Sequence, residues 1–156
     1  MTLLTKKETW EKLVELGIVA PDTFSEKLIF DGMDLQGWDF ERMDLSHASF
    51  TKADLTQTVI AHSLVYNSDF SKTEAFGGIF PNNDFRYANF QGASLINVDF
   101  SDCNLEHANF SSAYLSNGLF SNCNLRHTNF TDAYLQESNF AGADLTDDRS
   151  NLLLQN

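Results

Sequence analysis

The 156-residue sequence has little of what supports disulfide bonding, membrane insertion or contact with nucleic acid. Its two cysteines are too few for the disulfide framework of a small secreted domain. Ten Lys and Arg stand against 22 Asp and Glu, and the resulting formal charge of −12 argues against simple binding to nucleic acid or an anionic membrane. No apolar run approaches the roughly 20 residues of a membrane span, and residues 1–10 lack the apolar core of a signal peptide. These absences predict a soluble cytoplasmic protein with reduced thiols.

Phenylalanine, in contrast, is abundant and regularly placed. Twelve of the 14 Phe residues lie at positions divisible by five. From Phe30 to Leu145 every fifth residue is Phe, Leu, Ile, Val or Ala, and a second series of mostly small residues lies two positions before each of these centres. A period of five matches neither the 3.6 residues of an α-helix nor the 2.0 of a strand. The chain must therefore turn a corner about every five residues, with one large and one small side chain pointing inward each time.

The sequence also predicts how many corners make one coil. Residues 101–120 match residues 121–140 at 11 of 20 positions, whereas a shift of ten residues gives only 6 matches. Four pentapeptides therefore predict one 20-residue coil, and the 24 centres predict six coils. At the roughly 4.8 Å spacing of hydrogen-bonded strands, the stack is about 29 Å long.

The recurring Ala-(Asp/Asn)-(Leu/Phe)-x-x pattern over residues 28–147, as in Ala88-Asn89-Phe90, resembles the pentapeptide-repeat proteins. The resemblance implies a right-handed quadrilateral β-helix. With the coil count and the N-terminal residues, the predicted fold is an all-β solenoid of about six coils with a short N-terminal capping helix. We expect an N-terminal helix and cap over residues 1–27, the β-helix over 28–147 and a C-terminal tail over 148–156.

Both ends of the predicted rod depart from the repeat. Thr5 and Glu8 have the spacing of a capping box, so residues 6–16 are expected to form an amphipathic helix. We expect this helix to cover the open N-terminal edge of the β-helix. The first coil carries large residues in the usually small series, and these are expected to pack against the helix: Leu28, Met33, Trp38 and Met43. The apolar residues 152–154 either cover the last coil or mediate dimerisation.

Few residues of the sequence are suited to disulfide formation, metal binding or catalysis. Cys103 and Cys123 lie one coil apart in the inward series, so their parallel, buried side chains are poorly placed for a disulfide. His107 and His127 point outward without a carboxylate at fixed geometry, a weak metal signal, and the same column holds His47, Asn67 and Tyr87. No Gly-rich phosphate loop, nucleophile elbow or catalytic carboxylate pair stands out. We therefore expect no catalytic residue, cofactor or metal, and a protein that is not an enzyme.

Several outward positions lose their polarity around residues 59–81, and they define the first candidate surface. Val59, Ile79 and Leu119 share one outward column, which Asp99 interrupts. A neighbouring corner carries Phe76 and Ile96. Contiguous apolar surface is typical of a protein-binding site, so this face is expected to bind a protein or a second copy of the chain. The alternative is a local bulge that folds Phe76 inward and leaves only scattered exposed apolar residues.

Outward acidic residues define the second candidate surface, in two columns: Asp34, Asp54 and Glu74, and Asp44, Asp84 and Asp144. The resemblance to pentapeptide-repeat proteins implies a use for such charge, because the best understood members are acidic rods that mimic DNA. Those members occupy the DNA-binding saddle of type II topoisomerases and protect them from poisons. In that interpretation this protein inhibits or protects DNA gyrase, with binding that weakens steeply with salt. A spread of acidic residues also suits a solvated surface that keeps the protein soluble.

The sequence favours a non-enzymatic scaffold or adaptor that binds a protein partner of unknown identity. The binding region would be the apolar face, the stacked Tyr114 and Tyr134, or the ends of the rod. The alternative is an acidic DNA mimic whose partner is a topoisomerase. A homodimer through the apolar face is also open, and neither direct nucleic-acid binding nor membrane binding is expected.

Overall fold

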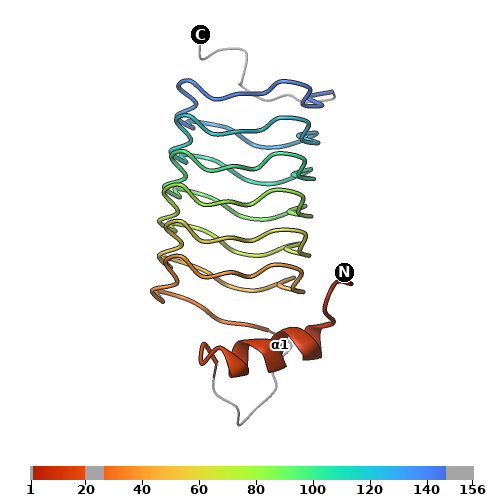
Figure 1. Cartoon of the computed structure of the whole chain (residues 1–156). Helices are drawn as coiled ribbons and strands as arrows, with labels where there is room; N and C mark the ends of the chain where they lie inside the picture. Colours follow the sequence, from red (N-terminus) through yellow and green to blue (C-terminus); the bar gives the residue numbers. More distant parts are fainter. Residues whose placement is uncertain (1, 20–26, 147–156) are drawn as a thin grey trace.

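The computed structural model describes residues 2–19 and 27–146, which form one helix followed by a stack of β-coils (Figure 1). Helix α1 spans Lys6–Glu15 and lies across the N-terminal end of the stack. The β-structure consists of single-residue parallel bridges, each joining a residue to the one 20 positions further on, from Ile29 with Ser49 to Asn124 with Asp144. The predicted 20-residue coil is confirmed, and residues 27–146 complete six coils.

Each corner contains a residue with left-handed backbone conformation. The second residue after each centre, from Gly32 to Gly142, has a φ between 53° and 73°. In most corners the third residue after the centre donates its N–H back to the centre carbonyl, as Met33 does to Phe30 at 3.1 Å. This hydrogen bond and the positive φ are those of a type II turn. Eighteen of these residues are not glycine, so the packed ladder holds a conformation that most side chains disfavour.

A side-chain hydrogen bond explains why Asp or Asn so often precedes the centre. Its Oδ1 accepts the N–H of the residue two positions later: Asp54 accepts from Thr56 at 3.0 Å, and Asn109 accepts from Ser111 at 3.1 Å. Only an acceptor oxygen is needed, so Asp and Asn serve equally well. The negative charge at these positions is therefore not required by the turn.

The interior of the coils is a ladder of aromatic and aliphatic side chains. Every centre from Phe30 to Phe130 is at most 3% exposed, which confirms the predicted core. Equivalent rings stack between coils, as Phe90 on Phe110 at 4.6 Å with an angle of 1°. Rings from different corners meet edge to face, as Phe100 and Phe110 at 5.6 Å and 81°. Both arrangements are favourable for aromatic pairs.

The sequence around α1 contains its own start and stop signals. The Thr5 hydroxyl accepts the N–H of Glu8, and the Glu8 carboxylate accepts the N–H of Thr5 at 2.8 Å, which completes the capping box. The Thr5 backbone bond and then the Thr5 hydroxyl bond lower the pKa of Glu8. Gly17, with a φ of 72°, follows the last turn and donates its N–H to Val14. The predicted helix is confirmed, ending one residue earlier than expected.

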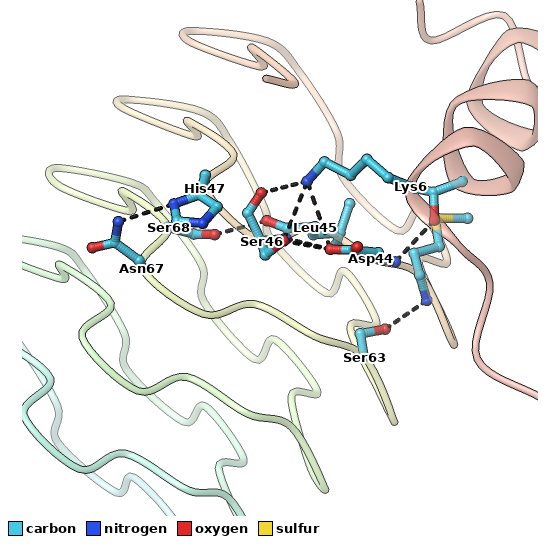
Figure 2. Close-up of polar contacts among 10 residues, drawn as sticks. Lys6, Asp44, Leu45, Ser46, His47, Ser63, Asn67 and Ser68 are labelled. Atoms are coloured by element: carbon cyan, nitrogen blue, oxygen red, sulfur yellow. Dashed lines mark hydrogen bonds and ion pairs between the residues drawn. The ribbon is translucent and has the colours of Figure 1, made fainter. Parts of the chain in front are cut away.

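Helix α1 is fastened to the first coils by buried and polar contacts. Thr9 and Leu13 are fully buried. Figure 2 shows Lys6 reaching from the helix to the corner at Asp44 and Ser46, where its ammonium donates to the Ser46 carbonyl and lies 3.6 Å from the Asp44 carboxylate. The backbone N–H of Asp44 donates in turn to the Thr9 hydroxyl at 2.9 Å. The helix therefore covers the end of the β-helix, as predicted.

The large residues of the first coil are not all covered. Leu28 and Met43 are at most 3% exposed, and Trp38 packs partly against the core. Met33 is 37% exposed, so the helix does not bury it, and its packing against the helix stays a prediction. Lys6 and Thr9 of α1 contact Asp44 and Ser46, whereas Met33 lies at a different corner of the coil. Residues 152–154 lie outside the described residues, and their two alternatives stay predictions.

Candidate protein-binding surface

Residues 59–81 keep the regular coil geometry. The bridges of Val59 with Ile79 and of Glu74 with Ser94 are in place, and Ala75 is fully buried at its centre position. Phe76 is 50% exposed. The bulge that would fold Phe76 inward is therefore absent, because a regular corner directs the residue after each centre toward solvent.

Four of the five apolar candidates lie in two neighbouring columns on adjacent coils, and we call them the apolar patch: Val59, Phe76, Ile79 and Ile96. Val59 and Ile79 are bridge partners, and Gly77 donates its N–H to the carbonyl of Ile96 at 3.0 Å, which sets Ile96 beside Phe76. Ile79 is 46% exposed, while Val59 and Ile96 are half-buried. The patch thus spans one face and the adjoining corner over three coils.

The fifth apolar candidate, Leu119, is separate from the apolar patch. It occupies the same column, but Asp99 bridges to Ile79 on one side and to Leu119 on the other. Leu119 is 40% exposed between polar neighbours. It therefore offers a natural control for changes made within the patch.

Two carboxylates lie at the two ends of the apolar patch along its column. Asp39 bridges to Val59 at one end, and Asp99 bridges to Ile79 at the other. Each uses Oδ1 for a turn: Asp39 accepts from Glu41 at 2.9 Å and Asp99 from Ser101 at 2.8 Å. Asp99 interrupts the apolar column in the sequence pattern, and the same 20-residue register also places Asp39 in that column.

The acidic candidates in the column of Asp44, Asp84 and Asp144 have strong local interactions. Asp44 pairs with Lys6, and Asp84 accepts two hydrogen bonds from the Arg86 guanidinium at 2.9 and 2.7 Å. Burial raises the pKa of Asp84, but hydrogen bonds and the charge of Arg86 outweigh it and leave that pKa below its ordinary value. The hydrogen bonds of Thr146, backbone first, lower the pKa of Asp144.

The other acidic column, Asp34, Asp54 and Glu74, has no ion pair within residues 2–19 and 27–146. Asp54 accepts a hydrogen bond from the Gln36 amide at 2.8 Å. Among the six acidic candidates, all except Glu74 accept the turn N–H described above. For these five residues the turn explains the need for an acceptor oxygen, but it does not explain the choice of Asp over Asn.

Aromatic and histidine rings line another corner, but their geometry does not suit a metal. His107 and His127 stack at 4.8 Å with an angle of 13°, and Tyr87 stacks on His107. The nitrogen lone pairs of parallel rings point in parallel directions and cannot converge on one ion. Across residues 2–19 and 27–146, no group of three or more His, Cys, Asp or Glu residues is placed to hold a metal.

The two cysteines are buried and hydrogen-bonded. The Cys103 thiol donates to the carbonyl of Phe80 at 3.0 Å, and the Cys123 thiol donates to that of Phe100 at 2.9 Å. They form no disulfide with each other. Burial raises the pKa of Cys103 well above its usual range and the pKa of Cys123 to about 12.

We expect both thiols of the folded protein to resist a disulfide reagent at pH 8. With a pKa of about 12, Cys123 has about a thousandfold less thiolate than an ordinary cysteine at that pH. Absorbance after addition of Ellman's reagent measures the reaction, and the protein in urea provides the control, in which both thiols should react at once. Rapid labelling of the folded protein would contradict the burial of this column.

Within the described residues, no helix has the length and apolar character that crossing a bilayer demands. The single helix, α1, has 10 residues.

Comparison with known proteins identifies the repeat. The model of the pentapeptide repeat region matches residues 76–149, and the model of pentapeptide repeats in 8 copies matches residues 30–60, so that together they cover about two thirds of the chain. No curated protein matches this chain.

Solved structures show the same fold. HetL, a pentapeptide repeat protein involved in heterocyst differentiation regulation from the cyanobacterium Nostoc, is 21% identical with a TM-score of 0.64, over 80% of this chain and 68% of HetL. QnrB1, a plasmid-mediated fluoroquinolone resistance protein, is 18% identical with a TM-score of 0.55, over 78% of this chain and 70% of QnrB1. By homology the coil is the right-handed quadrilateral β-helix that the repeat pattern implied, and the chain belongs to the pentapeptide-repeat protein family.

Proposed function

We propose that the protein is a non-enzymatic scaffold or adaptor that binds another protein through the apolar patch. The observation that carries the proposal is the contiguous exposure of Phe76 and Ile79 beside Val59 and Ile96. Apolar surface of this kind is typical of interaction sites, and a central aromatic residue often contributes most of the binding energy. Leu64, in contrast, lies alone between Asp44 and Asp84 in its column.

The alternative is an acidic DNA mimic that binds a topoisomerase. It is supported by the net charge of −12, by the family and by the fold shared with QnrB1, a fluoroquinolone resistance protein. Lys6 and Arg86 neutralise part of one acidic column, however, and the remaining unpaired column holds only Asp34, Asp54 and Glu74. We therefore favour the apolar patch as the binding region.

Changing Val59, Phe76 and Ile79 together to Ser is expected to weaken partner binding at least about tenfold, because each removes apolar contact from the centre of the interface. Capture from the source cell at low and high salt identifies the partner, and calorimetry with the purified partner measures the affinity. Leu119→Ser is the matched control, since it makes the same change in the same column outside the patch.

The same measurement separates the two candidate functions. A DNA mimic would bind purified DNA gyrase, lose that binding at high salt, and tolerate the three Ser substitutions. It would instead be weakened by Asp34→Asn with Asp54→Asn, which remove charge while an amide oxygen still accepts the turn N–H. That pattern would overturn the scaffold proposal.

A further inference from the structure

We propose that the segment bound at the apolar patch has an apolar centre flanked on both sides by Lys or Arg, whose cations meet Asp39 and Asp99. The inference rests on the proposed function, because it names the chemistry of the partner at the same patch. Its basis is the order Asp39, Val59, Ile79, Asp99 along one bridged column.

The spacing of this column defines the partner. Asp39 and Asp99 are three coils apart, which at the roughly 4.8 Å between bridged strands is about 14 Å. An amphipathic helix covers that distance in about nine residues, and an extended strand in about four. Basic side chains on either side of an apolar centre of that length would reach both carboxylates.

The two carboxylates are available to a partner. Asp39 is exposed and Asp99 is half-buried, and the turn hydrogen bond of each occupies Oδ1. Within residues 2–19 and 27–146 the ion pairs include neither residue, and the nearby Arg42 pairs with Glu41 at 2.9 Å. The negative charge at both ends of the patch is therefore not neutralised by the described chain.

When a partner covers the apolar patch, the two carboxylates affect how tightly that partner binds. A partner that displaces water from Val59 and Ile79 also partly desolvates the adjoining carboxylates, which is unfavourable unless cations replace the water. The attraction between opposite charges grows as water is excluded, whereas a neutral or acidic segment would leave both carboxylates uncompensated. Charge thus selects among apolar segments that would otherwise fit equally well.

The same charges disfavour a second copy of the chain. A two-fold axis that lies in the plane of the interface, perpendicular to the rods and level with the midpoint between Val59 and Ile79, makes the rods antiparallel and brings Asp39 of one copy opposite Asp99 of the other. Parallel rods in register place each carboxylate opposite its own equivalent. Both arrangements juxtapose like charges at the edge of the apolar contact, which is costly.

Selection from a display library of random 16-residue peptides tests the inference with the full chain as bait. We expect selected peptides to carry an apolar centre with Lys or Arg on both sides, and their recovery to require Phe76 and Ile79. Against a synthetic copy of one such peptide, Asp39→Asn with Asp99→Asn should weaken binding by about three- to tenfold at low salt and little at high salt, as expected for two exposed ion pairs.

A control with the same change in charge is available in Asp34→Asn with Asp54→Asn, which lie in a different column. Asn139 accepts the turn N–H of Ala141 at 2.9 Å in the column of Asp39, so an amide preserves the fold there, and thermal unfolding checks this. Selected peptides whose recovery requires Phe76 and Ile79 but that carry no flanking Lys or Arg would overturn the inference while leaving the scaffold proposal intact. Self-association that requires Ile79, seen by sedimentation, would also overturn it. Failure to select any patch-dependent peptide would count against both.

Discussion

Replacing Phe100 by Ala is expected to lower the free energy of unfolding by about 3–5 kcal/mol, the usual cost of removing a buried phenylalanine ring. Phe100 is fully buried and lies at the centre of the aromatic ladder. Its ring centroid is 5.7 Å from Phe80, 5.4 Å from Phe90, 5.6 Å from Phe110 and 5.4 Å from Phe120. No neighbouring backbone can close the resulting space without breaking the ladder of hydrogen bonds, so the cavity remains.

Urea unfolding followed by circular dichroism measures this effect. Phe100→Leu is the matched control, because Leu occupies the centres at Leu95 and Leu105. It should cost about half as much or less, since it leaves a smaller cavity. Contacts in a solenoid are local, so the Ala variant is also expected to weaken coupling between the coils on either side. Equal stability of the Ala and Leu variants would show that the size of the cavity does not determine the cost.

Replacing Asn83 by Leu is expected to cost about 3 kcal/mol, because it would leave two buried backbone groups, the N–H of Ser63 and the carbonyl of Ile60, without partners at about 1–3 kcal/mol each. Asn83 is 4% exposed in the series of small inward residues. Its Oδ1 accepts the N–H of Ser63 at 2.7 Å, and its amide donates to the carbonyls of Ile60 at 2.5 Å and Phe80 at 3.0 Å. These bonds take the place of the usual turn hydrogen bond at the corners after Ile60 and Phe80, which are stacked in successive coils.

The same unfolding experiment tests the role of Asn83. Asn104→Ala is the control, since Asn104 is half-buried and outward. Its Oδ1 accepts from the Glu106 N–H and the Asn124 amide, where water can take its place, so its loss should cost about 1 kcal/mol. A Leu variant of Asn83 that is as stable as the Ala variant of Asn104 would mean that the two corners can return to the ordinary turn at no cost.

The repeat made much of the fold predictable. A residue such as Phe90 points inward because its own pentapeptide turns on both sides of it, and that turn depends on neighbours within five positions. The coil length followed from the match between residues 101–120 and 121–140. The start of α1 followed from Thr5 and Glu8, whose capping bonds span only three residues.

The candidate surface was less predictable, because its parts come from different coils. The apolar patch required Phe76 to point outward, and the sequence allowed both a bulge and a regular corner at Ala75 and Gly77. The bridges between successive coils keep the corner regular. Asp39 cannot be recognised from its own pentapeptide, because it lies beside the patch only through its bridge to Val59, which is 20 residues away.

Contacts between coils and with α1 also determine which charged residues are paired. The net charge of −12 was apparent from composition. Lys6 forms an ion pair with Asp44, which is 38 positions away. This ion pair depends on how the helix docks on the first coil.

By itself, the sequence determined which residues face inward, the length of the coil, the capping helix and the family, because each rests on short-range spacing repeated along the chain. Only the tertiary structure decided the orientation of Phe76, the hydrogen bonds of Asn83 and the ion pair of Lys6 with Asp44. These depend on contacts between coils, where free energy is set by packing and hydrogen-bond geometry that no local pattern encodes.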